Sequence, residues 1–253
     1  KVRQYGLQFF KGSNPERTEN TTYPDIYSYK YPKAGEDNSK VSAWSFDIKS
    51  HRIQRLDIPL DADGYMPRIL STDDPDRIVV YTMNRHQDVL NLYGVNPRST
   101  VSHLLIKESV PKYVKEEAMA NIRLGKDYIL LPSDRDGYMH LYLYSGTGTL
   151  KRKIGDGNYD ITNVYGLDEK TGDVYYQAAV LNAHDRQIYV SHANGKTERL
   201  TRQEGWNSAV FSGDFQYFVN IWSDYNTPYV YTTRKNDGKI IATDVDNHEP
   251  VSY

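Results

Sequence analysis

The sequence contains no cysteine, which excludes a thiolate nucleophile, a cysteine-held zinc site and disulfide bonds. It also has no apolar run near the roughly 18 residues that a membrane-spanning helix requires. Neither sign of charge dominates, because 31 basic and 33 acidic residues leave a formal net charge of -2. We therefore expect no nucleic-acid partner and no membrane-spanning segment.

Short motifs of common catalytic centres are missing as well. The sequence has no G-x-S-x-G nucleophile elbow, no H-E-x-x-H zinc motif, no EF-hand loop and no P-loop. His140 alternates with tyrosines on a predicted strand, which favours a packing or surface role, and His184-Asp185 is typical of a solvated turn. None of the seven histidines lies in a recognisable nucleophile frame (51, 86, 103, 140, 184, 192 and 248). The sequence thus predicts no metal site, no cofactor and no catalytic residue.

Tyrosine is abundant, with 23 residues against 6 phenylalanines and 3 tryptophans. Its ring packs well on a half-buried pleated sheet while its hydroxyl reaches water. The 17 glycines and 11 prolines are spread along the chain, at predicted turns between short runs of β-forming residues. This composition predicts an all-β fold.

A run of alternating aliphatic residues around one aromatic recurs along the chain. The aligned aromatics lie 49, 49, 47 and 42 residues apart, at Trp44, Tyr93, Tyr142, Tyr189 and Tyr231. Two β-type runs precede most copies and one follows, and the turns between runs carry glycine at 137, 172, 195 and 238. A four-stranded meander with this period is typical of a β-propeller blade.

We therefore predict a β-propeller of four-stranded antiparallel blades, with about four complete blades and a partial one. A β-sandwich would also show many short strands but requires no such regular spacing. YGLQFF (5–10) is predicted as the inner strand of the partial blade. Only residues 112–124 have helix-forming composition, and their end is assigned to an inner strand. The blades are expected at residues 1–60 (partial), 61–110, 111–158, 159–205 and 206–246.

Few acidic residues stand out as candidate ligands. Glu116 and Glu117 form the one adjacent glutamate pair, on a segment that leads into an inner strand and so opens towards the propeller axis. Such a pair could hold a cationic amine, or it could be a solvated loop or a single helical turn. Asp61, Asp63 and Asp160 are the acids available for a five-bladed glycosidase, although they are typical of turns. Asn20-Thr21-Thr22 is a formal glycosylation sequon.

Three segments, in this order, resemble the propeller of the dipeptidyl peptidase IV branch of the prolyl oligopeptidase family. The first is YPDIYSYKYPKAGEDNSKVS (23–42), with its Y-P-K-A-G landmark. The second is the hairpin SDRDGYMHLYLY (133–144), and the third is LTRQEGWNSAVFSGDFQYFVNIWSDYNTPYVYTT (200–233), which is similar to the final blade. Their order and spacing extend the resemblance over most of the chain.

The resemblance implies that the chain is the C-terminal part of an eight-bladed propeller that caps an α/β-hydrolase domain. Enzymes of this family release dipeptides from amino termini, with proline or alanine in second position. The hydrolase domain, with its Ser, Asp and His, is expected after Tyr253, so this chain alone is expected to be inactive. The implied partners are its own hydrolase domain, peptide substrates and a second copy in a homodimer. The implied location is periplasmic or extracellular. The resemblance leaves open whether the full-length protein has a membrane anchor.

The family carries pocket-flanking residues just before the second landmark. The matching segment here is YVKEEAMAN (113–121), which departs from the family's aromatic and arginine pattern. From it we expect Tyr113, Glu116 and Glu117 to line the substrate pocket. The paired glutamates that hold the substrate's free amine in this family have no match here and are expected upstream of Lys1. A stand-alone propeller that binds a protein or a glycan is the alternative, and the sequence leaves ring closure and peptide preference open.

Overall fold

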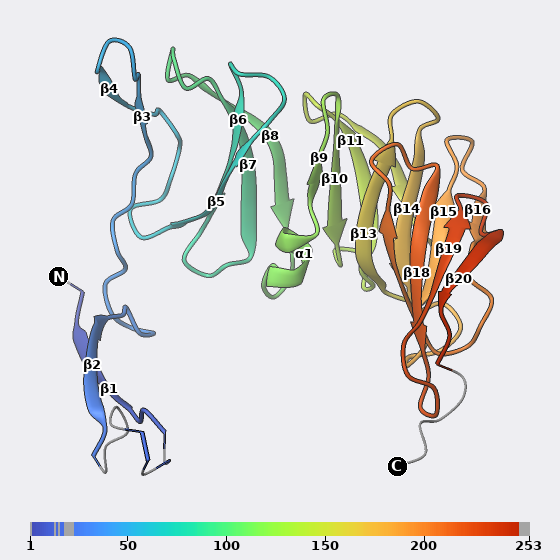
Figure 1. The fold of residues 1–253 in the computed structure, drawn as a ribbon. Coiled ribbons are helices and arrows are strands. Elements are labelled where there is room, and N and C mark those ends of the chain that lie inside the picture. Colours follow the sequence, from blue (N-terminus) through green and yellow to red (C-terminus); the bar gives the residue numbers. More distant parts are fainter. Residues whose placement is uncertain (1, 13, 15, 18–22, 248–253) are drawn as a thin grey trace.

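The computed structural model describes residues 2–12, 14, 16–17 and 23–247 of the chain, so the Asn20 sequon lies outside the described residues. Within them, four antiparallel four-stranded sheets and two two-stranded ribbons follow one another along the chain (Figure 1). Each four-stranded sheet is a meander whose spatial order equals its chain order. The predicted all-β fold with four-stranded antiparallel blades is confirmed.

The blades are numbered here in chain order. The first contains β5 (Tyr65–Ser71), β6 (Ile78–Met83), β7 (Val89–Val95) and β8 (Ser102–Ser109). The second contains β9 (Arg123–Leu124), β10 (Tyr128–Ser133), β11 (His140–Ser145) and β12 (Leu150–Ile154). The third contains β13 (Ile161–Asp168), β14 (Asp173–Ala178), β15 (Gln187–Ser191) and β16 (Thr197–Arg199). The fourth contains β17 (Trp206–Phe211), β18 (Tyr217–Ser223), β19 (Val230–Lys235) and β20 (Ile240–Val245).

The hydrophobic core lies between the blades, not within any one of them. Successive residues of a strand point to opposite faces of its sheet, so they enter different interfaces. Tyr81 of β6 packs against the second blade, whereas its neighbour Val80 packs towards β3 and β4. Leu131 of β10 faces the first blade, whereas Leu130 faces the third. This explains why the second strand is buried along nearly its whole length in the first three blades, whereas only alternate residues are buried in the second strand of the fourth.

The turns between strands follow the glycine pattern of the sequence. Gly137, Gly172, Gly195 and Gly238 all have positive φ angles, between 76° and 100°. Residues with a β-carbon adopt this region reluctantly, so glycine is the residue that closes these turns at low cost. The predicted turn positions are confirmed.

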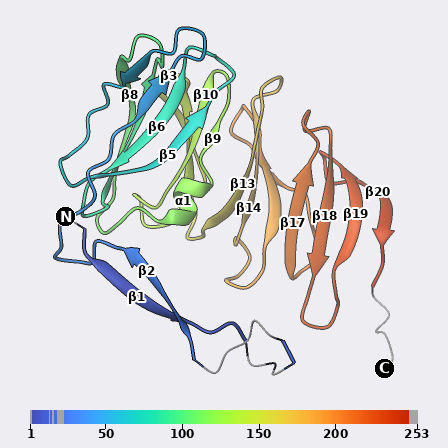
Figure 2. The same ribbon diagram turned by 60° about the vertical axis from the view of Figure 1, so that its left-hand side comes forward.

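The N-terminal segment differs from the prediction. YGLQFF lies largely in β1 (Gln4–Phe9), which pairs with β2 (Asp25–Lys30) in a separate ribbon, called the arm here. The arm extends away from the stacked blades (Figures 1 and 2). The partial unit therefore consists of β3 (Trp44–Phe46) and β4 (Ile53–Arg55). The assignment of YGLQFF as an inner strand is wrong, because β1 finds its hydrogen-bond partner in β2.

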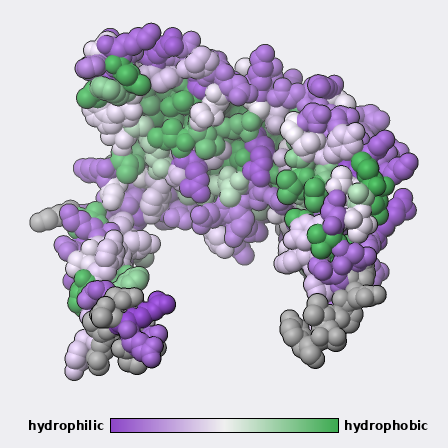
Figure 3. All heavy atoms as spheres, in the orientation of Figure 1, coloured by the Kyte–Doolittle hydropathy of each residue, from purple (hydrophilic) through white to green (hydrophobic). Residues whose placement is uncertain are grey.

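The faces at the two ends of the stack are apolar and uncovered (Figure 3). At one end, Trp44 and Phe46 of β3 are more than half exposed. At the other end, Trp206, Val210 and Tyr217 lie on the outward face of the fourth blade. Isolated sheets of this kind require neighbours on both faces, so these surfaces are typical of blades next to further blades.

Among the described residues, helix is confined to α1 (Glu116–Ala120), which joins β8 to β9 within the segment of helix-forming composition. Both ribbon views place α1 at the same end of the blades as the arm and the C-terminal end of β20 (Figures 1 and 2). This is called the α1 end of the molecule.

Candidate functional site

The segment of residues 113–121 lies across the junction of the first and second blades. Val114, Ala118 and Ile122 are buried, and a spacing of four residues places them on one side of the chain as it turns into α1. The backbone amide of Val114 donates to the carbonyl of Gln87 in the β6–β7 turn, at 2.7 Å. This anchoring leaves Tyr113 exposed and directs Glu116 away from the core.

Tyr113 and Glu116 line one side of a cavity of about 520 Å³, called the Tyr113 cavity here. Tyr65 of β5 and Met83 of β6 form another side, and Asn38 lies on a third. The lining is mainly apolar, with a few polar groups at fixed positions, as is typical of small-molecule and peptide sites. Two of the three residues predicted to line a pocket thus share one cavity.

Glu117 does not share it. Its side chain lines a second cavity, of about 220 Å³, on the other side of α1 (the Glu117 cavity), together with Lys115, Asn121 and Asp160. Adjacent residues on a helix project about 100° apart, which separates the two carboxylates. The structure therefore does not bring Glu116 and Glu117 together around one cation.

Glu116 has a nearby basic partner within the chain. Its Oε1 lies 3.9 Å from Nη2 of Arg68 on β5, and most of the carboxylate is solvent-exposed. An exposed pair of this length contributes little to stability. The carboxylate is consequently available to a cationic ligand that enters the Tyr113 cavity.

Arg85 stabilises the rim of the Tyr113 cavity, and sequence reasoning missed it. Its guanidinium lies 5.5 Å from the ring centroid of Tyr65 and donates to the Tyr65 hydroxyl. It also donates to the carbonyls of Lys33 and Glu36, at 3.5 and 3.3 Å. These contacts connect the Y-P-K-A-G segment to β5. No local pattern signalled this, since the partners are about 50 residues away along the chain.

The SDRDGY landmark forms the β10–β11 turn, and its side chains bind this turn to the neighbouring blade. Ser133 and Arg135 both donate to the carboxylate of Glu108 on β8, which is 2% exposed. Burial raises the pKa of Glu108, while the hydrogen bond from Ser133 and the charge of Arg135 act in the opposite direction. The guanidinium of Arg135 also lies 4.1 Å from the ring centroid of Tyr142. This network attaches the turn rigidly to the first blade.

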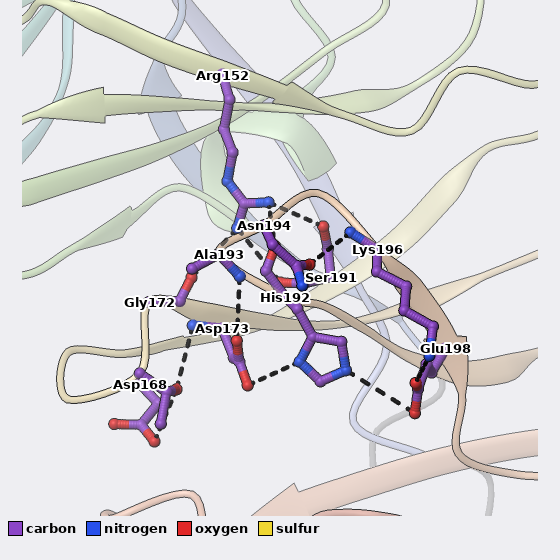
Figure 4. Close-up of polar contacts among 11 residues, drawn as sticks. Arg152, Asp168, Gly172, Asp173, Ser191, His192, Ala193, Asn194, Lys196 and Glu198 are labelled. Atoms are coloured by element: carbon purple, nitrogen blue, oxygen red, sulfur yellow. Dashed lines mark hydrogen bonds and ion pairs between the residues drawn. The ribbon is translucent and has the colours of Figure 1, made fainter.

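A second polar network joins the second and third blades near the far end from α1 (Figure 4). Arg152 of β12 donates to the Ser191 hydroxyl at 3.1 Å and to the His192 carbonyl at 2.7 Å. Nδ1 of His192 lies 3.0 Å from Asp173, so the imidazole and the Ser191 hydroxyl have different partners. This arrangement is a blade junction and not a nucleophile–base pair.

The other candidates from the sequence are structural or dispersed. His140 is buried, its Nε2 lies 3.1 Å from the carbonyl of Gly157, and burial lowers its pKa. Asp160 accepts a hydrogen bond from the Met139 amide at 2.7 Å, as a turn residue does. Asp61 lines cavities beside β4 and β6, and not the Glu117 cavity that Asp160 lines. These carboxylates do not converge on one site.

Two further observations cover the described part of the chain only. It contains no group of three or more His, Cys, Asp or Glu side chains placed to hold a metal ion. Nor does any helix within it have the length and apolar character needed to cross a bilayer.

Comparison with known proteins gives a consistent result. A family model described as the dipeptidyl peptidase IV N-terminal region matches residues 1–229. The crystal structure of Porphyromonas gingivalis dipeptidyl peptidase 4 superimposes on 98% of this chain, with a TM-score of 0.88 and 34% sequence identity.

Curated relatives include two fungal proteins. A probable dipeptidyl peptidase 4 of Aspergillus flavus is 25% identical over 243 residues, which cover 89% of this chain. Dipeptidyl peptidase 4 of Trichophyton rubrum is 23% identical over 248 residues, which cover 92% of it. The matches span 31% of each fungal protein and 34% of the Porphyromonas chain. The present chain therefore spans about a third of the length of these relatives.

Proposed function

The chain belongs to the dipeptidyl peptidase IV family, and from this premise we propose that it is the non-catalytic propeller portion of a serine dipeptidyl peptidase. The full-length enzyme releases N-terminal dipeptides whose second residue is proline or alanine. The nucleophile, base and oxyanion donors belong to an α/β-hydrolase domain that follows residue 253. The propeller portion controls access and orients the peptide over that domain.

The Tyr113 cavity is the observation that carries this proposal. It opens at the α1 end, where β20 also ends and where Asn247 donates to the Tyr229 carbonyl at 2.6 Å. A domain that continues from the fourth blade would start at this end. The cavity is thus favourably placed to face a hydrolase active site.

Within the cavity, Tyr113 and Glu116 line the pocket for the peptide's amino end. The apolar walls accept the first side chains of the peptide, and the exposed Glu116 carboxylate attracts its charged amine at longer range, since the glutamates that hold the amine are expected upstream of Lys1. Glu117 lines the neighbouring Glu117 cavity, and its charge attracts the peptide from a greater distance. Fixing one end of the peptide orients its scissile bond, and such orientation can contribute several kcal/mol, on the order of 7 to 11 in well-aligned cases.

The four blades and the β3–β4 unit form part of an eight-bladed ring in the full-length protein. The uncovered apolar faces around Trp44 and Val210 support this, because ring neighbours would bury both. A closed ring leaves only narrow entrances, which selects slender peptide ends. The full-length protein is extracellular or periplasmic, as its resemblance to the family implies.

A homodimer is the second part of the proposal, and the arm supports it. Leu7, Phe9 and Tyr27 project from one face of the ribbon and are 46%, 60% and 61% exposed. The rings of Phe9 and Tyr27 lie 6.4 Å apart, so they form one continuous surface. Exposed apolar patches of this kind usually mark interaction sites.

The test is turnover of Gly-Pro p-nitroanilide by the full-length protein and by the 253-residue chain. We expect the full-length protein to release p-nitroaniline and the isolated chain to release none, because it carries no catalytic triad. Equal activity of the two would contradict the assignment of roles. A full-length protein that binds peptides or glycans without hydrolysis would favour a stand-alone interaction module.

A further inference from the structure

The segment of residues 113–121 separates two cavities, and different ion pairs hold its side chains on the two sides. Tyr113, Glu116 and Met119 line the Tyr113 cavity, whereas Lys115 and Glu117 line the Glu117 cavity. Lys115 therefore lies on the side away from the proposed peptide. Whatever holds Lys115 acts on the peptide only through the backbone of this segment.

Lys115 is held by an ion pair. Its Nζ lies 3.0 Å from Oδ2 of Asp134 in the β10–β11 turn, and this hydrogen bond is the main reason why the pKa of Lys115 is raised. Lys115 is also the N-cap residue of α1, with extended backbone angles, and its side chain makes no capping hydrogen bond to the helix. The pair is therefore made at the residue where the chain changes from extended to helical.

Asp134 is a firm anchor because its turn is fixed on several sides. The neighbouring Ser133 and Arg135 bind the buried carboxylate of Glu108, and the Gly137 amide donates to the Asp134 carbonyl at 2.9 Å. Asp136, at the far side of the same turn, pairs with Lys153 at 2.8 Å. The position of Asp134 is thus set by both the first and the second blade.

The remaining anchors of α1 are weaker on the side of the Tyr113 cavity. α1 has only five residues, which is too short to be stable without tertiary contacts. Among the ion pairs of the described residues, Glu116 takes part only in the exposed 3.9 Å pair with Arg68. The direction of Tyr113 and Glu116 consequently depends on where the N-cap is held as well as on the buried side chains of Val114 and Ala118.

We infer that Lys115 and Asp134 are positioning residues, which orient Tyr113 and Glu116 towards the peptide without touching it. This inference rests on the proposed function. An orientation effect of this kind lowers the affinity for the peptide when it is lost, but leaves the chemistry of the hydrolase site intact. It therefore predicts a change in KM and not in kcat.

The experiment compares Lys115→Met, Asp134→Asn and the charge exchange Lys115→Asp/Asp134→Lys in the full-length protein, with Gly-Pro p-nitroanilide. We expect each single variant to raise KM about threefold to fivefold, in line with a partly exposed ion pair, with kcat within about twofold of the unmodified protein. The charge exchange should recover at least half of the loss on a logarithmic scale.

Lys153→Met is the matched control, because it breaks an ion pair of similar length on the same hairpin but away from α1. It should lower the melting temperature about as much as Lys115→Met and leave KM unchanged. Equal KM values for both variants, or no recovery on charge exchange, would overturn the inference. Absence of any turnover by the unmodified full-length protein would instead contradict the proposed function.

Discussion

Glu116 and Glu117 show how strongly the role of a residue depends on its direction. They are adjacent in the sequence and equally acidic, yet α1 places them in different cavities. Glu116 lies beside Tyr113 and Arg68, where a cationic peptide end would be favoured over the long ion pair. The two carboxylates can therefore be separated by mutation.

Glu116→Gln in the full-length protein is expected to raise KM for Gly-Pro p-nitroanilide about fivefold, because the amine loses an exposed charge partner worth about 1 kcal/mol. Glu117→Gln should change KM less than twofold. Steady-state kinetics at pH 7 measure both. The same KM for the unmodified and the Glu116→Gln protein would remove Glu116 from the pocket.

At the scale of elements, the blades are joined mainly by apolar contacts, with polar contacts between neighbouring blades added at both ends. Arg152 reaches from β12 to the turns of the third blade, and Arg77 donates to the Lys126 carbonyl in the second blade at 2.9 Å. The α1 end carries the Glu108 network together with the cavities and the short helix. The proposed recognition site is thus at one end of the blades, whereas polar contacts between blades occur at both.

Arg152→Met should lower the stability of the propeller by about 2 kcal/mol, because three part-buried carbonyls lose a charged donor at once. Differential scanning calorimetry of the full-length protein can detect the shift. Lys151→Met is the control, since that neighbouring side chain is exposed. An unchanged melting temperature for Arg152→Met would show that apolar packing alone holds this junction.

At the scale of the molecule, the blades form an arc with apolar faces at both ends and an aromatic arm at one side (Figures 1 and 3). Ring neighbours can cover the end faces. They do not cover the arm, which extends away from the blades. A second copy of the protein is the partner that we propose for it.

Phe9→Glu/Tyr27→Glu in the full-length protein is expected to convert the dimer into a monomer, because two charges would be buried in an apolar interface. Light scattering coupled to size-exclusion chromatography measures the mass. Ile26→Glu is the matched control, as Ile26 is also exposed but lies on the opposite face of β2. A monomeric unmodified protein, or a dimer that survives the double substitution, would contradict this assignment.

The sequence by itself determined the blades. Strand alternation, the regular spacing of Tyr93, Tyr142 and Tyr189, and the turn glycines are local features, and all three predicted the architecture correctly. The short helix in residues 112–124 was also predicted, because its composition is helix-forming over consecutive positions. Local propensities and periodic burial decide such features before distant contacts form.

Only the tertiary structure decided the pairing of β1 with β2, the separation of Glu116 from Glu117 and the ion pair between Lys115 and Asp134. Each depends on which surfaces meet after the blades have stacked. The burial of Val114 and Ala118 sets the direction of α1, and the packed turn of the second blade brings Asp134 within reach of Lys115. Contacts between positions that are not neighbours in the chain have no periodic signal, so no pattern in the sequence could specify them.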